Sequence, residues 1–278
     1  MKKLVLRPPF DRLWADCDPF AAVQNMGGEI VRDKEGRQTR RCEIAEGVFY
    51  RKVHTGVGWG EIVKNLVQGR KPVVDASNEW LAIERLRSLG IDTLEAVAFG
   101  VRGRNPATRR SFLVTRELTQ ALSTAVFTED WRYSPPSPAL RRAMVERIAD
   151  IARTLHNNGI NHRDLYLCHF LLDIGPGIER LGPDNLRFFL VDLHRAQMRK
   201  KVPRRWWVKD VASIYFSALD IGLHPRDMWR FLRVYFDQPL KQIVRRYGRE
   251  LRQIERKARK LYRRDFGREP QLPLLAPR

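Results

Sequence analysis

Hydrophobic and polar residues alternate with different periods in the two halves of this 278-residue chain, and the first half is strand-like. Short runs rich in β-branched and aromatic residues predict strands at 28–32, 39–44, 48–53, 94–100 and 111–116. Polar, turn-forming segments separate the first three runs, which predicts an antiparallel meander. Over 77–89, apolar residues recur every three positions, which is typical of an amphipathic helix ending at Gly90. Asp18 before Pro19 predicts the capped start of another short helix.

A proline-rich break at 134–138 leads into a second half whose period is helical. There the pattern predicts a long helix over 140–157, a strand–turn–strand region over about 168–192, and helices in most of the remainder. This order of elements predicts an α+β fold of two lobes. An N-terminal extension and a small β-rich lobe would occupy 1–134, and a larger helical lobe 135–278.

The chain is strongly basic, with 52 Lys and Arg against 32 Asp and Glu, a net charge of +20. This charge predicts an anionic partner: nucleic acid, an acidic membrane face or an anionic substrate. The positive charge is densest in 241–268, which contains twelve Lys and Arg but only three Asp and Glu. In the same segment, apolar residues recur at spacings of three and four. This segment predicts an amphipathic helix whose basic face either binds anionic phospholipid or is simply solvated.

The cysteines and the apolar runs indicate where the protein works. Cys17, Cys42 and Cys168 fit neither a metal-ligand spacing nor a disulfide framework, which favours a reducing compartment. The N-terminal apolar run is too short for a signal peptide, and no stretch approaches the roughly 18 apolar residues that span a bilayer. We therefore expect a cytoplasmic protein that is either soluble or peripheral at the inner face of a membrane.

Two carboxylates at the ends of a predicted hairpin are the most informative signal. The sequence NHRDLYLCHFLL (161–172) follows the end of a helix, so His162, Arg163 and Asp164 lie on a loop before a strand. A second apolar run ends in Asp192, 28 positions after Asp164. Phosphoryl transfer from ATP needs such a pair, because one aspartate accepts or orients the proton of the attacking hydroxyl. The other holds Mg²⁺ that bridges the phosphates.

The strand-rich half offers a lysine for the nucleotide phosphates. Lys52 lies near the end of the strand 48–53, and a carboxylate on the 77–89 helix would hold it in place. Glu79 is the best candidate and Glu84 the competing one, although Lys52 and Glu79 could be ordinary solvated charges. No GxGxxG loop is present. The order of elements places the backbone contacts to adenine near Glu117.

At these positions the chain resembles the lipopolysaccharide core heptose(I) kinase family, a divergent branch of the protein-kinase-like superfamily. The resemblance covers nearly the whole chain and is most specific in 161–172, VDLHRA (191–196) and KVPRRWWVKD (201–210). It implies a bilobal protein-kinase-like fold. It also implies ATP-dependent phosphorylation of the first heptose of the lipopolysaccharide inner core, at the cytoplasmic face of the inner membrane.

The resemblance also implies a role for each matching residue. Asp164 would be the catalytic aspartate and Asp192 the metal-binding one, with Lys52 at the nucleotide phosphates and Glu79 as its partner. Asp210, expected at the start of a helix, would brace the catalytic loop from beneath or serve as a plain helix N-cap.

Two departures from the wider kinase pattern stand out. His169 occupies the position, five residues after Asp164, where protein kinases place a metal-binding Asn. Imidazole is a poor ligand for Mg²⁺, so His169 is a metal ligand, a hydrogen-bond donor to phosphate or Asp192, or a core histidine. Asp192 is followed by Leu-His-Arg rather than Phe-Gly, which favours a constitutively competent site.

The segment after Asp192 predicts the class of acceptor. It contains no Ser, Thr or Tyr between Arg195 and Trp207, so the usual switch of a regulated protein kinase is absent. Its basic residues suit an anionic lipid A–core glycolipid, with Arg195, Arg204 or Arg205 gripping sugar carboxylates or phosphates. The alternatives are Kdo or another core sugar, an aminoglycoside, or protein tyrosine. A nucleic-acid partner is not expected, because the two aspartates would then have no purpose.

Overall fold

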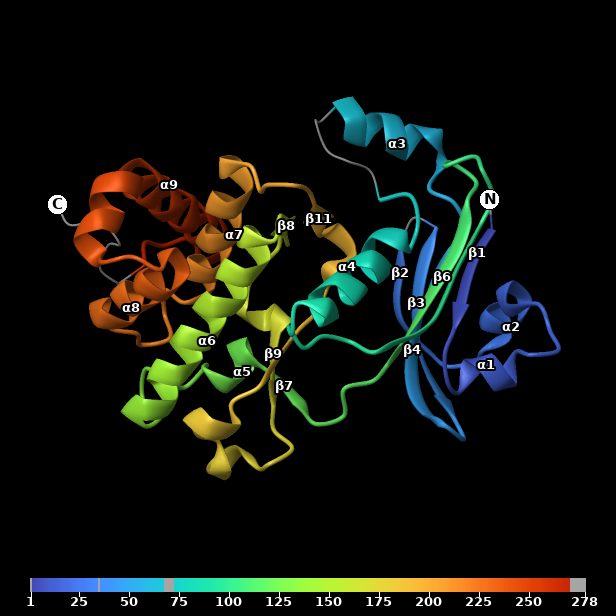
Figure 1. Ribbon diagram of the computed structural model, residues 1–278, viewed down its shortest axis with the longest axis horizontal. Helices are drawn as coiled ribbons and strands as arrows, with labels where there is room; N and C mark the ends of the chain where they lie inside the picture. Colours follow the sequence, from blue (N-terminus) through green and yellow to red (C-terminus); the bar gives the residue numbers. More distant parts are fainter. Residues whose placement is uncertain (1, 35, 68–72, 271–278) are drawn as a thin grey trace. The chain divides into compact units, whose positions relative to one another are not determined.

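The computed structural model of the chain describes residues 2–34, 36–67 and 73–270. Its contacts divide the chain into a β-rich unit and a helical unit (Figure 1). The β-rich unit comprises Met1–Ser88, Thr93–Thr119 and Asp192–Arg195, and the helical unit comprises Leu89–Asp92, Gln120–Val191 and Ala196–Arg278. The predicted α+β class, with strands first and helices second, is confirmed. The lobe boundary at residue 134 stays a prediction.

An antiparallel sheet with the strand order β1-β5-β6-β4-β3-β2 forms the centre of the β-rich unit. Its strands are β1 (Lys2–Leu6), β2 (Glu29–Lys34), β3 (Arg37–Ile44), β4 (Gly47–His54), β5 (Ala96–Arg102) and β6 (Arg110–Arg116). The last five lie where the sequence predicts strands. β1 was not predicted, because its short run gains its partner only from β5, more than 90 residues later in the sequence.

One face of this sheet is covered by the N-terminal helices α1 (Phe10–Leu13) and α2 (Pro19–Asn25) (Figure 1). Five buried aromatic side chains form a cluster between these helices and the sheet: Phe10, Trp14, Phe20, Phe49 and Phe112. The predicted cap of α2 is present, because the carboxylate of Asp18 accepts a hydrogen bond from the backbone of Phe20 at 3.4 Å.

The opposite face of the sheet contacts α4 (Ser77–Ser88), the helix predicted over 77–89 (Figure 1). Trp80 on α4 stacks on Phe99 of β5, with ring centroids 4.9 Å apart. A further helix, α3 (Gly58–Val67), follows β4. The two faces of the sheet are therefore covered by different parts of the sequence.

In the described part of the helical unit the α-helices are α5 (Thr124–Phe127), α6 (Pro138–Asn157), α7 (Arg204–Ser217), α8 (Pro225–Phe236) and α9 (Leu240–Phe266). α6 packs on α8, and α7 packs on α9. The predicted helix over 140–157 and the predicted basic C-terminal helix are thus both present. Ile243, Leu251 and Ile254 of α9 are buried, whereas Tyr247 interrupts its helical backbone.

Short strands and 3-10 turns connect these helices. A small sheet contains β10 (Phe188–Leu190), β9 (Phe170–Asp173) and β7 (Ala121–Ser123) in that order, and β8 (Ile160–Asn161) pairs with β11 (Gln197–Met198). The 3-10 turns are η1 (Leu167–His169), η2 (Ile178–Arg180), η3 (Pro183–Asn185) and, in the β-rich unit, η4 (Leu193–Arg195). The antiparallel pair of β9 and β10 confirms the predicted strand–turn–strand region.

The start of α7 corrects the sequence interpretation. The helix begins at Arg204, after the N-cap Pro203, and not at Asp210. Aspartate is a preferred N-cap, which made residue 210 the expected start. Pro203 instead supplies an extended backbone before the first turn, and Asp210 lies buried inside the helix. Across the described residues, no helix is both long and apolar enough to cross a membrane.

Candidate active site

The backbone of the loop that carries Asp164 is held in an unusual conformation. Gly159, at the end of α6, has a φ of +75°, and a Cβ there would lie 1.7 Å from the carbonyl oxygen of Arg199. Only glycine fits so close an approach. Arg163, directly before Asp164, has a φ of 77°. A positive φ costs a non-glycine residue about 1 kcal/mol or more, so it persists only where the surroundings hold it.

Asp210 on α7 holds this loop from within the protein core. Its Oδ2 accepts a hydrogen bond from the backbone N–H of His162 at 2.7 Å, and its Oδ1 accepts one from that of Arg163 at 2.8 Å. The side chain of Asp210 is fully buried, so these charge-assisted bonds are shielded from water. Nε2 of His156 lies 3.3 Å from the same carboxylate. With these contacts, Asp210 supports the loop from beneath. The interpretation of Asp210 as the N-cap of the helix was wrong, because α7 begins at Arg204.

Lys209 places a positive charge beside Asp164, and the sequence analysis missed it. Its ammonium lies 3.4 Å from Oδ1 of Asp164 and donates to the carbonyl oxygen of Arg163. The side chain of Asp164 is 17% exposed and therefore stays partly accessible to solvent. The only local signal was the position of Lys209 directly before Asp210.

The side chains of His162 and His169 also contact this part of the chain. Nδ1 of His169 lies 2.7 Å from the carbonyl oxygen of Asp164. Because a carbonyl only accepts, Nδ1 of His169 carries the proton in this hydrogen bond. The rings of His162 and His169 stack 5.8 Å apart. His169 therefore has a structural contact with the loop, and its role as a metal ligand stays a prediction.

Asp192 follows β10 closely and also has a strained backbone, with a φ of 61°. The residue before it is tied to the Asp164 loop within the helical unit. The backbone N–H of Val191 donates to the carbonyl of His169 at 3.0 Å, and Nε2 of His162 lies 3.0 Å from the carbonyl of Val191. One oxygen of the Asp192 carboxylate contacts Nδ1 of His194. Three described non-glycine residues have a positive φ, and two of them, Arg163 and Asp192, are site candidates.

In the β-rich unit, Lys52 on β4 forms an ion pair with Glu79 on α4, with Nζ and Oε1 2.5 Å apart. Glu79 is buried and Lys52 is partly exposed, at 3% and 21% of their side-chain surface. The competing candidate, Glu84, instead pairs with Arg7 at 2.6 Å. The structure therefore places Lys52 where a buried carboxylate fixes its ammonium.

Two further residues lie on the same face as Lys52. Arg37 and His54 are directly opposite each other on β3 and β4. Burial lowers the pKa of His54 to about 4, with the charge of Arg37 as the next cause, so its imidazole is neutral near pH 7. Burial also lowers the pKa of Arg37, and the nearby carboxylate of Glu79 opposes this effect. The sequence analysis named neither residue, because strand pairing brings them together.

Glu117, the candidate near adenine, is engaged through its side chain. Its carboxylate accepts hydrogen bonds from Arg41 at 2.7 Å and from the hydroxyl of Tyr50 at 3.2 Å. The hydrogen bond from Arg41 lowers the pKa of Glu117. Its backbone N–H donates to the carbonyl of Val48 at 2.9 Å. Its contact with ATP stays a prediction.

The sequence model of the lipopolysaccharide kinase (Kdo/WaaP) family matches residues 21–235 of this chain. The chain belongs to this family. The lipopolysaccharide core heptose(I) kinase WaaP of Pseudomonas aeruginosa is 49% identical over 262 residues, which cover 94% of this chain and 97% of that protein. WaaP of Escherichia coli is 45% identical over 260 residues, 93% of this chain and 97% of that protein. A solved structure, "WaaP in complex with acyl carrier protein", is 45% identical, with a TM-score of 0.82 over 94% of this chain and 99% of that chain.

Membership of the Kdo/WaaP family confirms the resemblance and makes the chain an ATP-dependent phosphotransferase that acts on a sugar. A kinase of this family requires a nucleotide-phosphate cation and a catalytic carboxylate. In the β-rich unit the predicted cation is Lys52, which Glu79 holds. In the helical unit the predicted carboxylate is Asp164, on a loop that Asp210 holds. Both roles stay predictions.

The three arginines expected to bind the acceptor lie in different surroundings. Arg204 forms an ion pair with Glu250 of α9 at 2.8 Å. Arg205 is exposed and stacks over the indole of Trp206, 5.1 Å from its centroid. Arg195 ends η4 in the β-rich unit. Arg204 and Arg205 therefore share one helix turn, whereas Arg195 belongs to the other unit.

The carboxylate of Asp192 is a donor of the kind that magnesium prefers. The described residues contain no group of three or more His, Cys, Asp or Glu side chains arranged to hold a metal ion. Mg²⁺ needs few protein ligands, because it takes one or two carboxylates and completes its shell with phosphate oxygens and water. The carboxylate of Asp192 fits that requirement.

Proposed function

We propose that this kinase transfers the γ-phosphoryl group of ATP to heptose I of the lipopolysaccharide inner core. The names of its relatives support this acceptor, because heptose(I) kinases are 45–49% identical over most of the chain. One observation carries the mechanism: the carboxylate of Asp210 accepts hydrogen bonds from the backbone of His162 and Arg163. These bonds hold Asp164 in place before the substrate binds. Such preorganisation is a main source of catalysis in phosphoryl transfer.

In the proposed mechanism the two units have separate tasks. Lys52, held by Glu79, neutralises the phosphates of ATP. Asp164 orients the attacking heptose hydroxyl and accepts its proton as the new bond to phosphorus forms. The ammonium of Lys209 beside Asp164 offsets the negative charge that gathers at the transferring group.

Asp192 and, as a second candidate, His169 are the residues that would hold Mg²⁺. When bound, Mg²⁺ neutralises phosphate charge and aligns the oxygens of the leaving diphosphate. The contact between His194 and Asp192 limits the rotation of the carboxylate. An oxygen ligand is preferred by this cation, so Asp192 is the main ligand and His169 orients the loop.

The acceptor is an anionic glycolipid, and we propose that Arg205 and Arg195 contact its carboxylates or phosphates. Arg204 is the weaker candidate because Glu250 already neutralises it. The basic composition supports this choice over a cationic aminoglycoside, which a chain of net charge +20 would repel. Kdo, another core sugar and protein tyrosine remain as alternative acceptors, and they are separated by the position of the transferred label.

The test is transfer of label from γ-labelled ATP to purified, unphosphorylated inner-core glycolipid, comparing wild type with Asp164→Asn. Label on heptose I that largely disappears in the variant supports both the acceptor and the role of Asp164. Label on Kdo, or on tyrosine of an added protein, would replace the heptose proposal with that acceptor. Equal activity of the variant would show that Asp164 is not the catalytic carboxylate.

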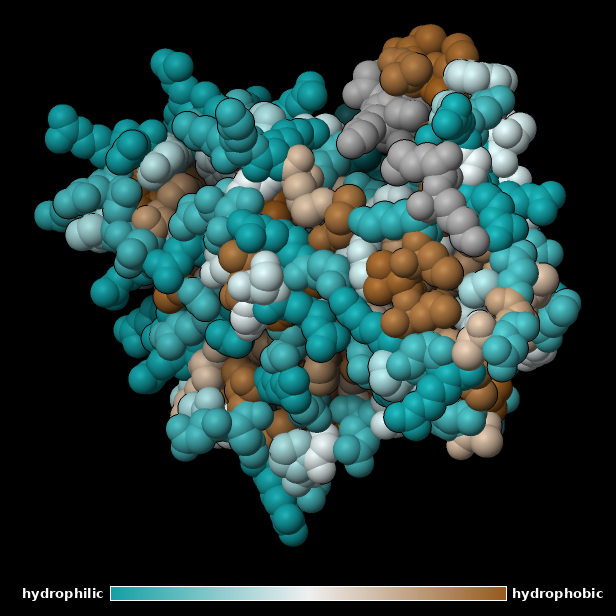
Figure 2. All heavy atoms as spheres, turned by 45° about the vertical axis from the view of Figure 1, so that its right-hand side comes forward, coloured by the Kyte–Doolittle hydropathy of each residue, from teal (hydrophilic) through white to brown (hydrophobic). Residues whose placement is uncertain are grey.

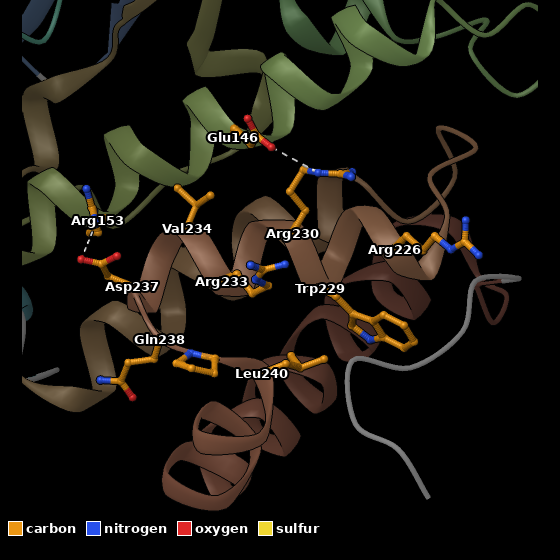
Figure 3. A pocket seen from close by; sticks show the side chains of 11 residues that line it. Glu146, Arg153, Arg226, Trp229, Arg230, Arg233, Val234, Asp237, Gln238 and Leu240 are labelled. Carbon is orange, nitrogen blue, oxygen red and sulfur yellow. Dashed lines mark ion pairs between the residues drawn. The ribbon is translucent and has the colours of Figure 1, made fainter.

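A second proposed partner is an acyl carrier protein, the protein that accompanies WaaP in the similar solved complex. One feature of the helical unit supports it. On α8, Arg226, Trp229 and Arg233 line a groove, and Arg153 and Arg230 add further positive charge to it (Figure 3). This groove is suited to an anionic protein surface.

Purified acyl carrier protein provides the test of this partner. We expect wild type to retain it on an affinity column and Arg226→Glu/Arg233→Glu to lose it. Arg252→Glu/Lys257→Glu reverses the same number of exposed charges on α9 and is the matched control. Equal retention of all three proteins would exclude the α8 groove as the docking site.

We also propose that the enzyme binds the inner membrane from its cytoplasmic face. The basic α9 supports this location, and so does α3, where Trp59, Val63, Leu66 and Val67 are exposed. Apolar side chains of α3 gather on the surface of the β-rich unit (Figure 2). An exposed apolar stripe is typical of a helix at the membrane interface, and a basic helix face is attracted to anionic phospholipid.

Vesicle sedimentation tests this location. Wild type should sediment with anionic but not with neutral vesicles at low salt, and Leu66→Asp/Val67→Asp should sediment less. Failure of wild type to sediment with anionic vesicles would contradict the proposal.

A further inference from the structure

Arg37 is a second cation on the sheet face that carries Lys52. In an antiparallel pair, residues directly opposite each other point to the same face, and so do residues two positions apart on one strand. Arg37 is opposite His54, and Thr39 is opposite Lys52. All four side chains therefore share one face. Arg37 and Lys52 are diagonal neighbours on it, with Cβ atoms about 7 Å apart.

Among the described residues, no carboxylate forms an ion pair with the guanidinium of Arg37, although Glu79 and Asp192 act on its charge. Its side chain is half-buried. The ion pairs and hydrogen bonds of the described residues include none that engages its guanidinium. Burial is the main cause of its lowered pKa, and the carboxylates of Glu79 and Asp192 act in the opposite direction. A partly desolvated guanidinium with no direct partner is unfavourable unless an anion joins it.

The described residues near Arg37 do not supply that anion. Glu79 already forms a 2.5 Å ion pair with Lys52. His54 on the strand opposite is neutral near pH 7, because its pKa is lowered to about 4. If Asp192 holds Mg²⁺, its carboxylate is also compensated. The face then carries excess positive charge, which the phosphates of a nucleotide would balance.

The sequence of the hairpin explains why an arginine is needed there. In many kinases a glycine-rich loop covers the phosphates with backbone N–H groups. The hairpin formed by β2 and β3 has no GxGxxG motif, and Arg37 is the first residue of β3. A guanidinium is planar and donates two parallel hydrogen bonds to a phosphate, which a lysine cannot do.

We propose that Arg37 binds the terminal phosphates of ATP and takes the place of the missing glycine-rich loop. This inference rests on the proposed function, in which Lys52 binds the same nucleotide. The two cations would divide the task, because Lys52 is fixed by Glu79 while the guanidinium of Arg37 has no such partner among the described residues. Nucleotides should then be distinguished by the number of their phosphates.

Nucleotide affinity is the direct test, measured by calorimetry with ATP, ADP and AMP in the presence of Mg²⁺ and without acceptor. Arg37→Met should weaken ATP binding about tenfold or more, because a charge-assisted contact is lost. AMP binding should change less than twofold, and Arg37→Lys should restore part of the ATP affinity. Arg40→Met is the matched control, since Arg40 lies on the same strand and the opposite face. Its ATP affinity should equal that of wild type.

The outcomes separate this inference from the proposed function. Unchanged ATP affinity in Arg37→Met, or an equal loss for ATP and AMP, would overturn the role of Arg37. Thermal unfolding without nucleotide detects a merely structural defect. Arg37→Met should unfold within about 2 °C of wild type, since it removes no ion pair or hydrogen bond between described side chains. Failure to label the glycolipid, with the ATP and AMP results as expected, would reject the acceptor and leave Arg37 as a phosphate ligand.

Discussion

The two faces of the six-stranded sheet in the β-rich unit have opposite character, although the same strands build both. On β4, Phe49 and Val53 point into the aromatic cluster beneath α1 and α2. Tyr50, Lys52 and His54 alternate with them and point to the other face, where Glu79 lies. A period of two residues thus separates the part of the strand that stabilises the fold from the part that we propose binds the nucleotide.

Because the two faces are separate, we expect the stability of the fold and the use of ATP to respond to different substitutions in the same strand. The aromatic face excludes water and gains free energy from burial. The polar face keeps charges such as Arg37 and Lys52 partly desolvated, which costs free energy until a ligand binds. Changes to the first face should therefore unfold the protein, and changes to the second should reduce nucleotide use.

The largest effect should come from the aromatic face. Phe49→Ala removes a fully buried ring whose centroid lies 5.0 Å from that of Phe10. We expect the free energy of unfolding to fall by about 3–5 kcal/mol, because the cavity cannot collapse completely. Urea unfolding measures this loss. The ATP affinity of the remaining folded protein should match wild type, and a specific loss of ATP binding would break the comparison.

The next effect tests whether the polar face also limits stability. The pKa of His54 is lowered from 6.5 to about 4 by burial. Between these values the unfolded chain binds a proton that the folded protein excludes, so stability is complete above pH 6.5 and falls as the pH drops towards 4. The loss should reach about 3 kcal/mol. Urea midpoints from pH 7 to pH 4 measure it, and His54→Phe should lack this part of the slope. Equal slopes in both proteins would mean that His54 titrates normally.

A third substitution sharpens the comparison on the polar face. Glu79→Gln removes the charge that fixes Lys52 and keeps the shape of the side chain. We expect kcat/KM for ATP to fall about a hundredfold, or about 2.7 kcal/mol, because the ammonium is no longer held. Glu84→Gln is the control, since Glu84 is on the same helix but pairs with Arg7. A similar loss in both variants would assign the effect to α4 rather than to the ion pair.

Much of this arrangement could be predicted from the sequence because its signals are local. Alternation along β4 placed Lys52, and the loop before a strand placed Asp164. Lys209 and Arg37 escaped prediction because their surroundings depend on contacts between distant segments. Lys209 meets Asp164 only through the packing of α7, and Arg37 meets His54 only through strand register.

The helix start at Asp210 was misplaced for a related reason. A side-chain cap is the strongest local sign of a helix start, and Pro203 provides none. Asp210 instead uses its carboxylate to bind the backbone of a loop 47 residues earlier in the sequence. From a single sequence, an aspartate that binds the backbone of a distant loop cannot be distinguished from an aspartate that caps a helix.

The smallest effect returns to the aromatic face, at the start of α2. Asp18 accepts a hydrogen bond from the backbone N–H of Phe20, whose ring lies 5.0 Å from that of Phe112. Asp18→Ala should lower the free energy of unfolding by about 1 kcal/mol, because the cap also orients this ring. Asp18→Asn retains an N-cap oxygen but not the charge that pairs with Arg102, so it should recover most of the loss. Urea unfolding measures both variants, with ATP affinity as the second readout. If Asp18→Asn were as unstable as Asp18→Ala, the ion pair with Arg102 rather than the cap would hold α2 on this face.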